Sequence, residues 1–315
     1  MVEALVEPIL PFELALWTNQ STTLGMSSDW QVDSYDSRDP QKSGAGGTYP
    51  GPASPNTQSN GNIGSNLGRP ASSLYGPLIN INGISVRGIV ATNGGDDPQT
   101  AAHENVTGAT LIDPSKIRDN FCREMPPIVR PSGLSAQPPP PDGQPYVAGP
   151  GSTPTAYLVP GDLGAFTIAT PPAGQSSAII IMVNGDFILN GALSIPANVT
   201  AILYVLGNVN LQGYAVNSGS GASNLPAQLQ IYGEYSGIER RTLQAAGSST
   251  VCAAFYGPDY DASLSGNTDW RGAIASRSFE VRSSGAGGVH YDEALGVIGP
   301  TVSFRIARYV EDVRE

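Results

Sequence analysis

Short apolar runs separated by glycine-rich turns are the main pattern along this chain of 315 residues. Between residues 251 and 295 the apolar pieces read AAFYG, ASLSGN, GAIA and FEV, with Gly, Pro, Asp, Asn and Ser between them. Such pieces are too short for a stable helix, and their alternating apolar residues are typical of β-strands. A short strand cannot bury one face alone, so the pattern predicts strands that stack on one another.

The sequence contains an internal repeat of 22 residues, which sets the expected spacing along the chain between stacked strands. The segments VNGDFILNG (183–191) and VLGNVNLQG (205–213) align without gaps, with identical residues at Val183/Val205, Gly185/Gly207, Leu189/Leu211 and Gly191/Gly213. A period of roughly 20 to 26 residues with glycine corners is typical of a solenoid. It predicts an all-β fold, a single right-handed parallel β-helix with long Gly/Pro-rich loops and terminal capping segments.

The domain organisation follows from the same pattern. We expect a β-helix domain over residues 15–315, preceded by a linker or assembly segment over residues 1–14. Residues 126–160 hold 11 of the 27 prolines and predict an extended surface excursion that links two parts of the fold, with a recognition or spacer arm as the alternative. Residues 286–315 are expected to form a C-terminal cap, and a short helix is expected to start at Pro114.

Composition and charge narrow the classes of function. Only 14% of the residues are charged, whereas 38 Gly and 27 Pro favour turns and strands over long helices. The formal net charge of −11 argues against nucleic acid or an anionic membrane as a partner. Lys and Arg are absent between Arg130 and Arg240, which excludes a basic groove there. The sequence contains no run of eighteen apolar residues, so we expect no membrane-spanning segment.

Motifs towards both ends of the chain resemble those of one family. ALWTNQSTTLG and VDSYDS lie within residues 15–37, and the later motifs are Tyr256-Gly257-Pro258, Leu264-Ser265-Gly266-Asn267, Gly272-Ala273-Ile274 and His290 to Leu295 (HYDEAL). From about residue 14 to the end, the chain resembles the C-terminal β-helical domain of bacterial type IV pilus-associated (PilX-like) surface proteins.

The resemblance implies a structural or adhesive role and an extracellular or cell-surface location. The function of the family is itself poorly defined, so no particular chemistry is implied. Members usually carry an N-terminal pilin-like hydrophobic helix, which is not found in this sequence. The motifs at the two ends are the specific part of the match, whereas the middle matches β-helices in general.

The densest polar cluster consists of His290, Tyr291, Asp292 and Glu293. On a strand, His290 and Asp292 share one side while the other two share the opposite side. An acid/base or metal site is one hypothesis, but a metal needs further ligands and His103 is the only other histidine. We interpret the four residues as a structural lock, in which His and Asp hydrogen-bond to turn backbone where the stack ends.

Two weaker candidate features remain, a disulfide and a calcium site. Cys122 and Cys252 permit one disulfide, but two cysteines barely constrain the redox compartment. Carboxylate oxygens of the kind that calcium binds are offered by four aspartates, Asp33, Asp36, Asp259 and Asp261. Asx-turn capping is the alternative role for these aspartates. We predict no cofactor and no catalytic residue.

These observations predict a non-enzymatic structural subunit of an extracellular filament or pilus-like assembly, which associates with itself. A monomeric surface adhesin that binds glycans is the first alternative, because Ser, Thr, Asn, Gln and Gly suit hydrogen bonds to sugars. A carbohydrate-active enzyme on a β-helix is the second. Such an enzyme needs clustered carboxylates, usually with basic residues, but Asp186 is the only charged residue between positions 177 and 233.

Overall fold

The computed structural model shows an all-β protein, which confirms this part of the predicted fold. Twenty strands belong to one large, mostly parallel sheet, and two more form a separate antiparallel pair. Helical structure within the described residues consists of 3₁₀ turns, namely η1 (Ala45–Gly47), η3 (Pro114–Lys116), η4 (Pro226–Gln228) and η5 (Glu293–Val297). The structure describes residues 2–25, 29–67, 79–82, 84–93, 106–107, 114–118, 121–128, 130–151, 153–234, 239–282, 285–299 and 303–311.

The large sheet consists of three ladders of parallel strands. Ladder 1 contains, in spatial order, β12 (Thr155–Val159), β13 (Ser177–Val183), β15 (Val199–Val205), β17 (Leu229–Gly233), β19 (Thr250–Ser265), β20 (Asp269–Arg282), β2 (Leu16–Thr18), β5 (Ile63–Ser65), β8 (Val90–Ala91) and β10 (Ile117–Arg118). β11 (Gly149–Pro150) adds an antiparallel pairing with β13.

The other two ladders share β19 or β20 with the first. Ladder 2 contains β14 (Phe187–Ile188), β16 (Val209–Asn210), β18 (Arg241–Ala245), the second parts of β19 and β20, β3 (Thr22–Gly25), β6 (Ile79–Asn82) and β9 (Val106–Thr107). Ladder 3 contains the first part of β20, β21 (Gly287–Asp292), β4 (Trp30–Tyr35) and β7 (Ser85–Val86).

A buried row of apolar side chains runs in register along ladders 1 and 3. In ladder 1 the row consists of Tyr157, Ile181, Leu203, Ile231, Phe255, Ile274, Leu16, Ile63, Val90 and Ile117. In ladder 3 it consists of Trp270, Val289, Val32 and Val86. Each fully buried aliphatic or Phe side chain contributes roughly 1.5–3 kcal/mol, so these rows are the main source of stability.

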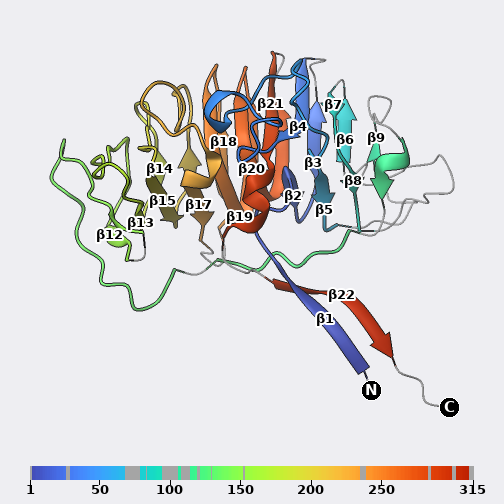
Figure 1. The fold of residues 1–315 in the computed structure, drawn as a ribbon, viewed down its shortest axis with the longest axis horizontal. Coiled ribbons are helices and arrows are strands. Elements are labelled where there is room, and N and C mark those ends of the chain that lie inside the picture. The colour runs from blue at the N-terminus through green and yellow to red at the C-terminus, as the bar shows by residue number, and fades with distance from the viewer. Residues whose placement is uncertain are drawn as a thin grey trace.

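The order of the strands in space differs from their order along the chain (Figure 1). The chain enters the middle of the sheet at β2, proceeds to one end at β9 and β10, and enters again at the opposite end with β12. It then returns strand by strand to the middle, where β20 and β21 pair with β2, β3 and β4. We call this junction between early and late strands the seam.

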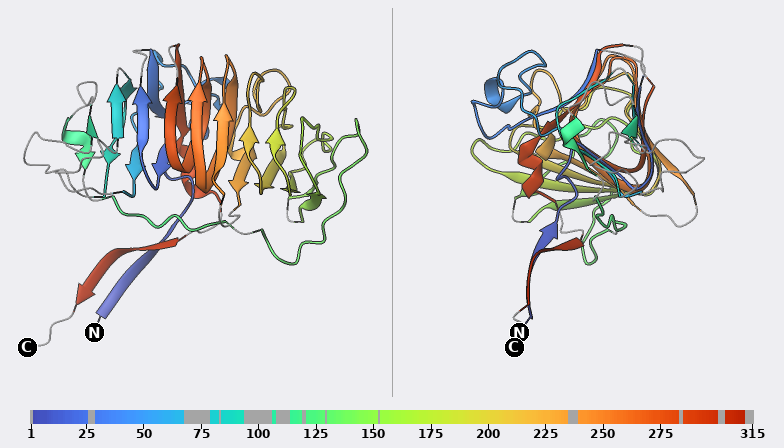
Figure 2. Two further views of the ribbon diagram at one scale, coloured as in Figure 1. Left: turned by 180° about the vertical axis from the view of Figure 1, so that it is seen from behind. Right: turned by 90° about the vertical axis from the view of Figure 1, so that its right-hand side faces the viewer.

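The prediction that residues 286–315 cap one end is wrong. β21 lies in the middle of the sheet, paired with β20 on one side and β4 on the other. β22 (Ser303–Glu311) pairs antiparallel with β1 (Val2–Ile9), and together they form a ribbon that projects from the body (Figures 1 and 2). The expected linker over residues 1–14 does not form one separate segment either. β1 lies in the ribbon, whereas Phe12 is fully buried in the core.

Residues 126–154, which we call the strap, connect the two ends of the sheet and run along the body (Figure 1). The hydroxyl of Tyr256 donates to the carbonyl of Pro126 at 2.7 Å. Farther along, Arg130 forms an ion pair of 2.7 Å with the buried Glu234, and Gln137 forms a parallel bridge with Tyr157 of β12. The strap therefore lies against ladder 1, and the last part of the predicted proline-rich excursion is β12 itself.

Helices play little part in the fold. The short helix expected at Pro114 is wrong, because η3 is a single turn that leads directly into β10. The physical reason is that Ile117 completes the buried row of ladder 1 opposite Val90, which requires extended backbone there. Within the described part of the chain, no helix is long and apolar enough to cross a membrane.

The buried rows give a direct test of the fold. Ile181 is fully buried in ladder 1, whereas Ile188 at the end of β14 is 41% exposed. We expect Ile181→Ala to lower the free energy of unfolding by about 2–5 kcal/mol, because it leaves a cavity, and the matched Ile188→Ala to change it by less than about 0.5 kcal/mol. Urea denaturation followed by circular dichroism measures both. Equal effects of the two substitutions would contradict the arrangement of the rows.

Candidate functional site

Three neighbouring strands bring charged side chains together at the seam. His290 of β21 lies opposite Asp33 of β4, and its other neighbour, β20, supplies Asp269 and Arg271. The imidazole Nδ1 lies 2.6 Å from Asp33 Oδ1, and Nε2 lies 2.7 Å from Asp269 Oδ1. The ring of His290 thus joins two carboxylates that are more than two hundred positions apart in the sequence. We call Asp33, Tyr49, Asp269, Arg271 and His290 the seam cluster.

A loop closes the seam cluster from outside. The ring of Tyr49 stacks on the imidazole of His290, with centroids 3.7 Å apart and planes 18° apart. Its hydroxyl donates to Asp33 Oδ2 at 2.7 Å. As a result His290 is only 4% exposed and Asp33 is fully buried. A charged group removed from water in this way needs close partners of opposite charge, and both carboxylates meet that need.

The protonation state of His290 follows from these contacts. Burial opposes the charged ring, but the hydrogen bonds to Asp269 and Asp33 outweigh it and raise the pKa of His290 to about 9. Burial also works to raise the pKa of Asp269, yet His290 and Arg271 lower it below its ordinary value. His290 and Asp269 are therefore both charged at neutral pH. A protonated ring whose two N–H groups both point at carboxylates has no free nitrogen to act as a general base.

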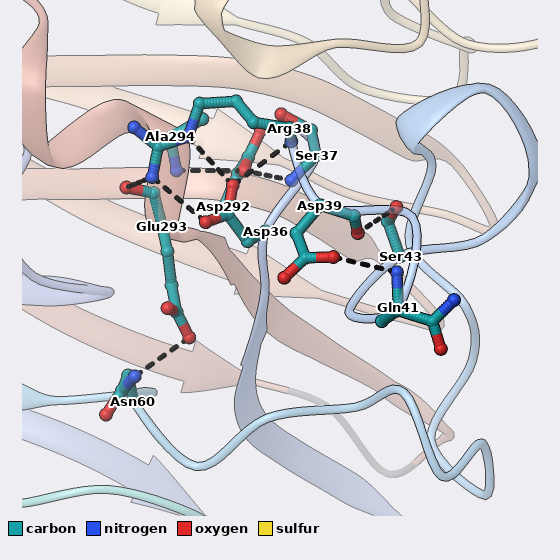
Figure 3. Close-up of polar contacts among 10 residues, drawn as sticks. All are labelled: Asp36, Ser37, Arg38, Asp39, Gln41, Ser43, Asn60, Asp292, Glu293 and Ala294. Atoms are coloured by element: carbon teal, nitrogen blue, oxygen red, sulfur yellow. Dashed lines mark hydrogen bonds and ion pairs between the residues drawn. The ribbon is translucent and has the colours of Figure 1, made fainter.

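The three residues after His290 also contact the early part of the chain. Asp292 Oδ1 accepts hydrogen bonds from the backbone N–H of Ser37 at 3.0 Å and of Ala294 at 3.1 Å, the second of which caps η5 (Figure 3). Glu293 Oε1 accepts from Asn60 Nδ2 at 2.9 Å (Figure 3). The hydroxyl of Tyr291 donates to the carbonyl of Phe12 at 2.8 Å. Every residue of the predicted lock thus bridges the seam.

The predicted lock needs two corrections. It lies in the middle of the sheet and not where the strands end, because the early strands continue the stack beyond β21. Only Asp292 binds turn backbone as predicted, whereas His290 binds two carboxylates. Asp269, Tyr49 and Arg271 were not predicted as partners, since no motif or repeat relates them to HYDEAL. The pairing of early with late strands alone brings these side chains together.

The calcium candidates have separate environments. Asp33 is part of the seam cluster, and Asp36 forms an ion pair of 2.9 Å with Arg38, which lowers the pKa of Asp36 (Figure 3). Asp261 lies on β19, where it binds Arg277 and Ser278. Burial raises the pKa of Asp259. Across the described ranges, no three His, Cys, Asp or Glu side chains gather as metal ligands would.

The remaining residues named in the sequence analysis are the two cysteines and the second histidine. Cys122 is exposed and Cys252 is buried, and both are free, so the disulfide that the sequence permits is not formed. Burial raises the pKa of the Cys252 thiol to about 12, which keeps it protonated and unreactive. His103 lies outside the described residues.

Comparison with known proteins yields one match. Residues 175–298 match a family model described as a domain of unknown function (DUF7305). This range covers β13 to η5, less than half of the chain, and contains Asp269, Arg271 and His290 but neither Asp33 nor Tyr49. No curated protein matches the chain, and no solved structure does.

The seam cluster makes stability depend on pH in a defined way. The pKa of His290 is about 9 in the fold, compared with about 6.5 in an unfolded chain. Its contribution is therefore complete below about pH 6.5 and is lost as pH rises through 9, with a total on the order of 3 kcal/mol. We expect the free energy of unfolding to fall between pH 6.5 and 9.5 in the native protein and much less in His290→Gln.

His103→Gln is the matched control for this measurement, because it removes the only other histidine. Urea denaturation at half-unit pH steps gives the slope for each protein. The slope should persist in His103→Gln. An unchanged slope in His290→Gln would show that the seam cluster does not hold a charged imidazole.

Proposed function

We propose that this chain is a single right-handed parallel β-helix with a structural, non-enzymatic role, as a subunit of an extracellular or cell-surface filament. Three ladders of short parallel strands support the β-helix, and the right-handed sense follows the strong preference of parallel crossover connections. The extracellular location rests on the resemblance to PilX-like surface proteins. The low content of charged residues and the many Gly, Ser, Asn and Thr residues are consistent with a subunit that packs against copies of itself outside the cell.

The geometry of the seam cluster supports a structural role and argues against a catalytic one. Its histidine has both nitrogens engaged, its ring is covered by Tyr49, and its carboxylates serve as partners of His290 and Arg271. A catalytic base needs an atom free to take up a proton, and both nitrogens of His290 already face carboxylates. Groups arranged to neutralise one another inside a seam instead hold two parts of the chain together.

The ribbon of β1 and β22 is the observation that carries the assembly role. It projects from the body (Figure 2), and its two strands pair only with each other among the described residues. An isolated two-stranded ribbon is marginally stable in water, and each of its outer edges presents unpaired backbone groups to another chain. A neighbouring subunit that adds a strand to this ribbon would stabilise it, as in β-strand addition.

Removal of the ribbon tests this proposal. A variant that comprises residues 10–302 keeps Phe12 and the whole seam, so we expect a folded monomer with nearly native melting temperature. The full chain should form larger assemblies, visible by negative-stain electron microscopy and light scattering, and the shortened variant should not.

Two outcomes would overturn the proposal. Filaments that form equally well without the ribbon would assign assembly to another surface. A full chain that stays monomeric at high concentration would favour the alternative of a monomeric adhesin. As a control for general loss of stability, Ile181→Ala in the full chain should leave assembly unchanged under conditions where it stays folded, since this residue is buried in the body and not in the ribbon.

A further inference from the structure

A cavity of about 380 Å³ opens beside the seam cluster. Its wall comes from segments on both sides of the seam, and the residues that matter here are Gln31, Tyr49, Pro50, Asn267, Asp269 and Arg271. The volume lies in the range of sites that hold small molecules. The cavity exists only because the early strand β4 and the late strands β20 and β21 lie side by side.

The charges in the wall compensate one another. Asp269 binds His290 through Oδ1 and Arg271 through Oδ2, at 2.7 and 2.9 Å. The guanidinium of Arg271 also lies 5.7 Å from the centre of the Tyr49 ring. Asp29 also lines the cavity. A charged ligand that approaches Asp269, Arg271 and His290 would find these charges already paired, so its desolvation would be poorly offset. A neutral ligand with many hydroxyl groups avoids this penalty.

The wall also offers hydrogen-bonding groups to such a ligand. Gln31 lines the cavity, and its Oε1 is buried without a donor among the described residues. A buried acceptor without a donor is unfavourable by about 1–3 kcal/mol. The terminal torsion of a glutamine is broad, so the amide can turn its oxygen towards a hydroxyl in the cavity. Asn267, which is exposed, also lines the cavity.

Apolar surface accompanies these polar groups. Pro50 and Pro52 form part of the wall next to Tyr49. A sugar ring presents hydroxyl groups around its edge and C–H groups on its faces, so it matches a wall of amides, paired charges and prolines. Ligand sites in general combine apolar lining with a few convergent polar groups.

We propose that this cavity binds one unit of a neutral sugar, whose hydroxyls hydrogen-bond to Gln31, Asn267 and the outer edges of Asp269 and Arg271. The site goes beyond the structural role and does not depend on assembly. It would let a filament subunit carry a sugar on its surface, beside the ion pairs of Asp269 with His290 and Arg271.

The test uses the full chain and defined sugars. Saturation-transfer NMR and titration calorimetry are carried out with methyl glycosides of glucose, galactose and mannose, with glucuronate and with glucosamine. At least one neutral glycoside should bind, and about tenfold more tightly than either charged sugar. Gln31→Leu, which removes the acceptor at similar size, should weaken that binding by about tenfold, the effect of one hydrogen bond.

Matched variants separate binding from folding. Gln212→Leu changes an exposed glutamine that bonds to Gln244 outside the cavity, and should leave sugar binding unchanged. Asn267→Ala removes a second wall residue that lies in an exposed turn, and should weaken binding even if Gln31→Leu fails to fold. The proposal is overturned if no neutral glycoside binds, if a charged sugar binds more tightly, or if neither cavity variant weakens binding.

The outcome is distinguishable from that of the assembly experiment. The variant that comprises residues 10–302 retains every residue of the cavity wall and should bind the sugar as the full chain does. Loss of filaments with retained sugar binding supports both proposals. Filaments that form while no sugar binds would overturn only the proposal that the cavity binds a sugar.

Discussion

The pairing of early with late strands at the seam is the constraint on which the rest of this structure depends. Asp33 and His290 meet although 257 positions separate them. The entropy of closing so long a loop rises only slowly with its length, by about 0.6 kcal/mol for each doubling. The buried rows and the seam cluster are sufficient to offset it. Without the seam, two partial stacks would each expose an unpaired strand edge in the middle of the body.

The strap is a direct consequence of this chain order. Since the chain leaves the sheet at one end and enters it again at the other, a segment must run the length of the body. Proline suits that segment, because it keeps the backbone extended and removes amide donors that no strand would accept. Arg130 fixes the strap by pairing with Glu234, whose pKa is nevertheless raised by burial. Ile128 and Leu134 pack against the core, so the strap also covers apolar surface.

The local repeat could be predicted from the sequence, but the order of the strands could not. The 22-residue offset reappears as the register itself, because Val183 lies opposite Val205 and Phe187 opposite Val209. Strands that follow one another along the chain leave such a signal. The seam leaves none, since Asp33 and His290 belong to segments with no shared spacing. HYDEAL could therefore be predicted as a lock, while its partners and its place in the middle of the sheet depend on pairing that only the structure shows.

The seam cluster has a second physical effect, on the register of the seam. Side chains alternate along a strand, so burying Val289 and Val32 excludes a slip by one residue but permits a slip by two. After a slip by two, His290 would lie opposite Gln31 or Tyr35 and the charged ring would lose the carboxylate of Asp33. Removing one partner of a buried ion pair is far more unfavourable than the intact pair is favourable. The cluster thus selects a single register, and that register is what places Gln31, Asp269 and Arg271 around one cavity.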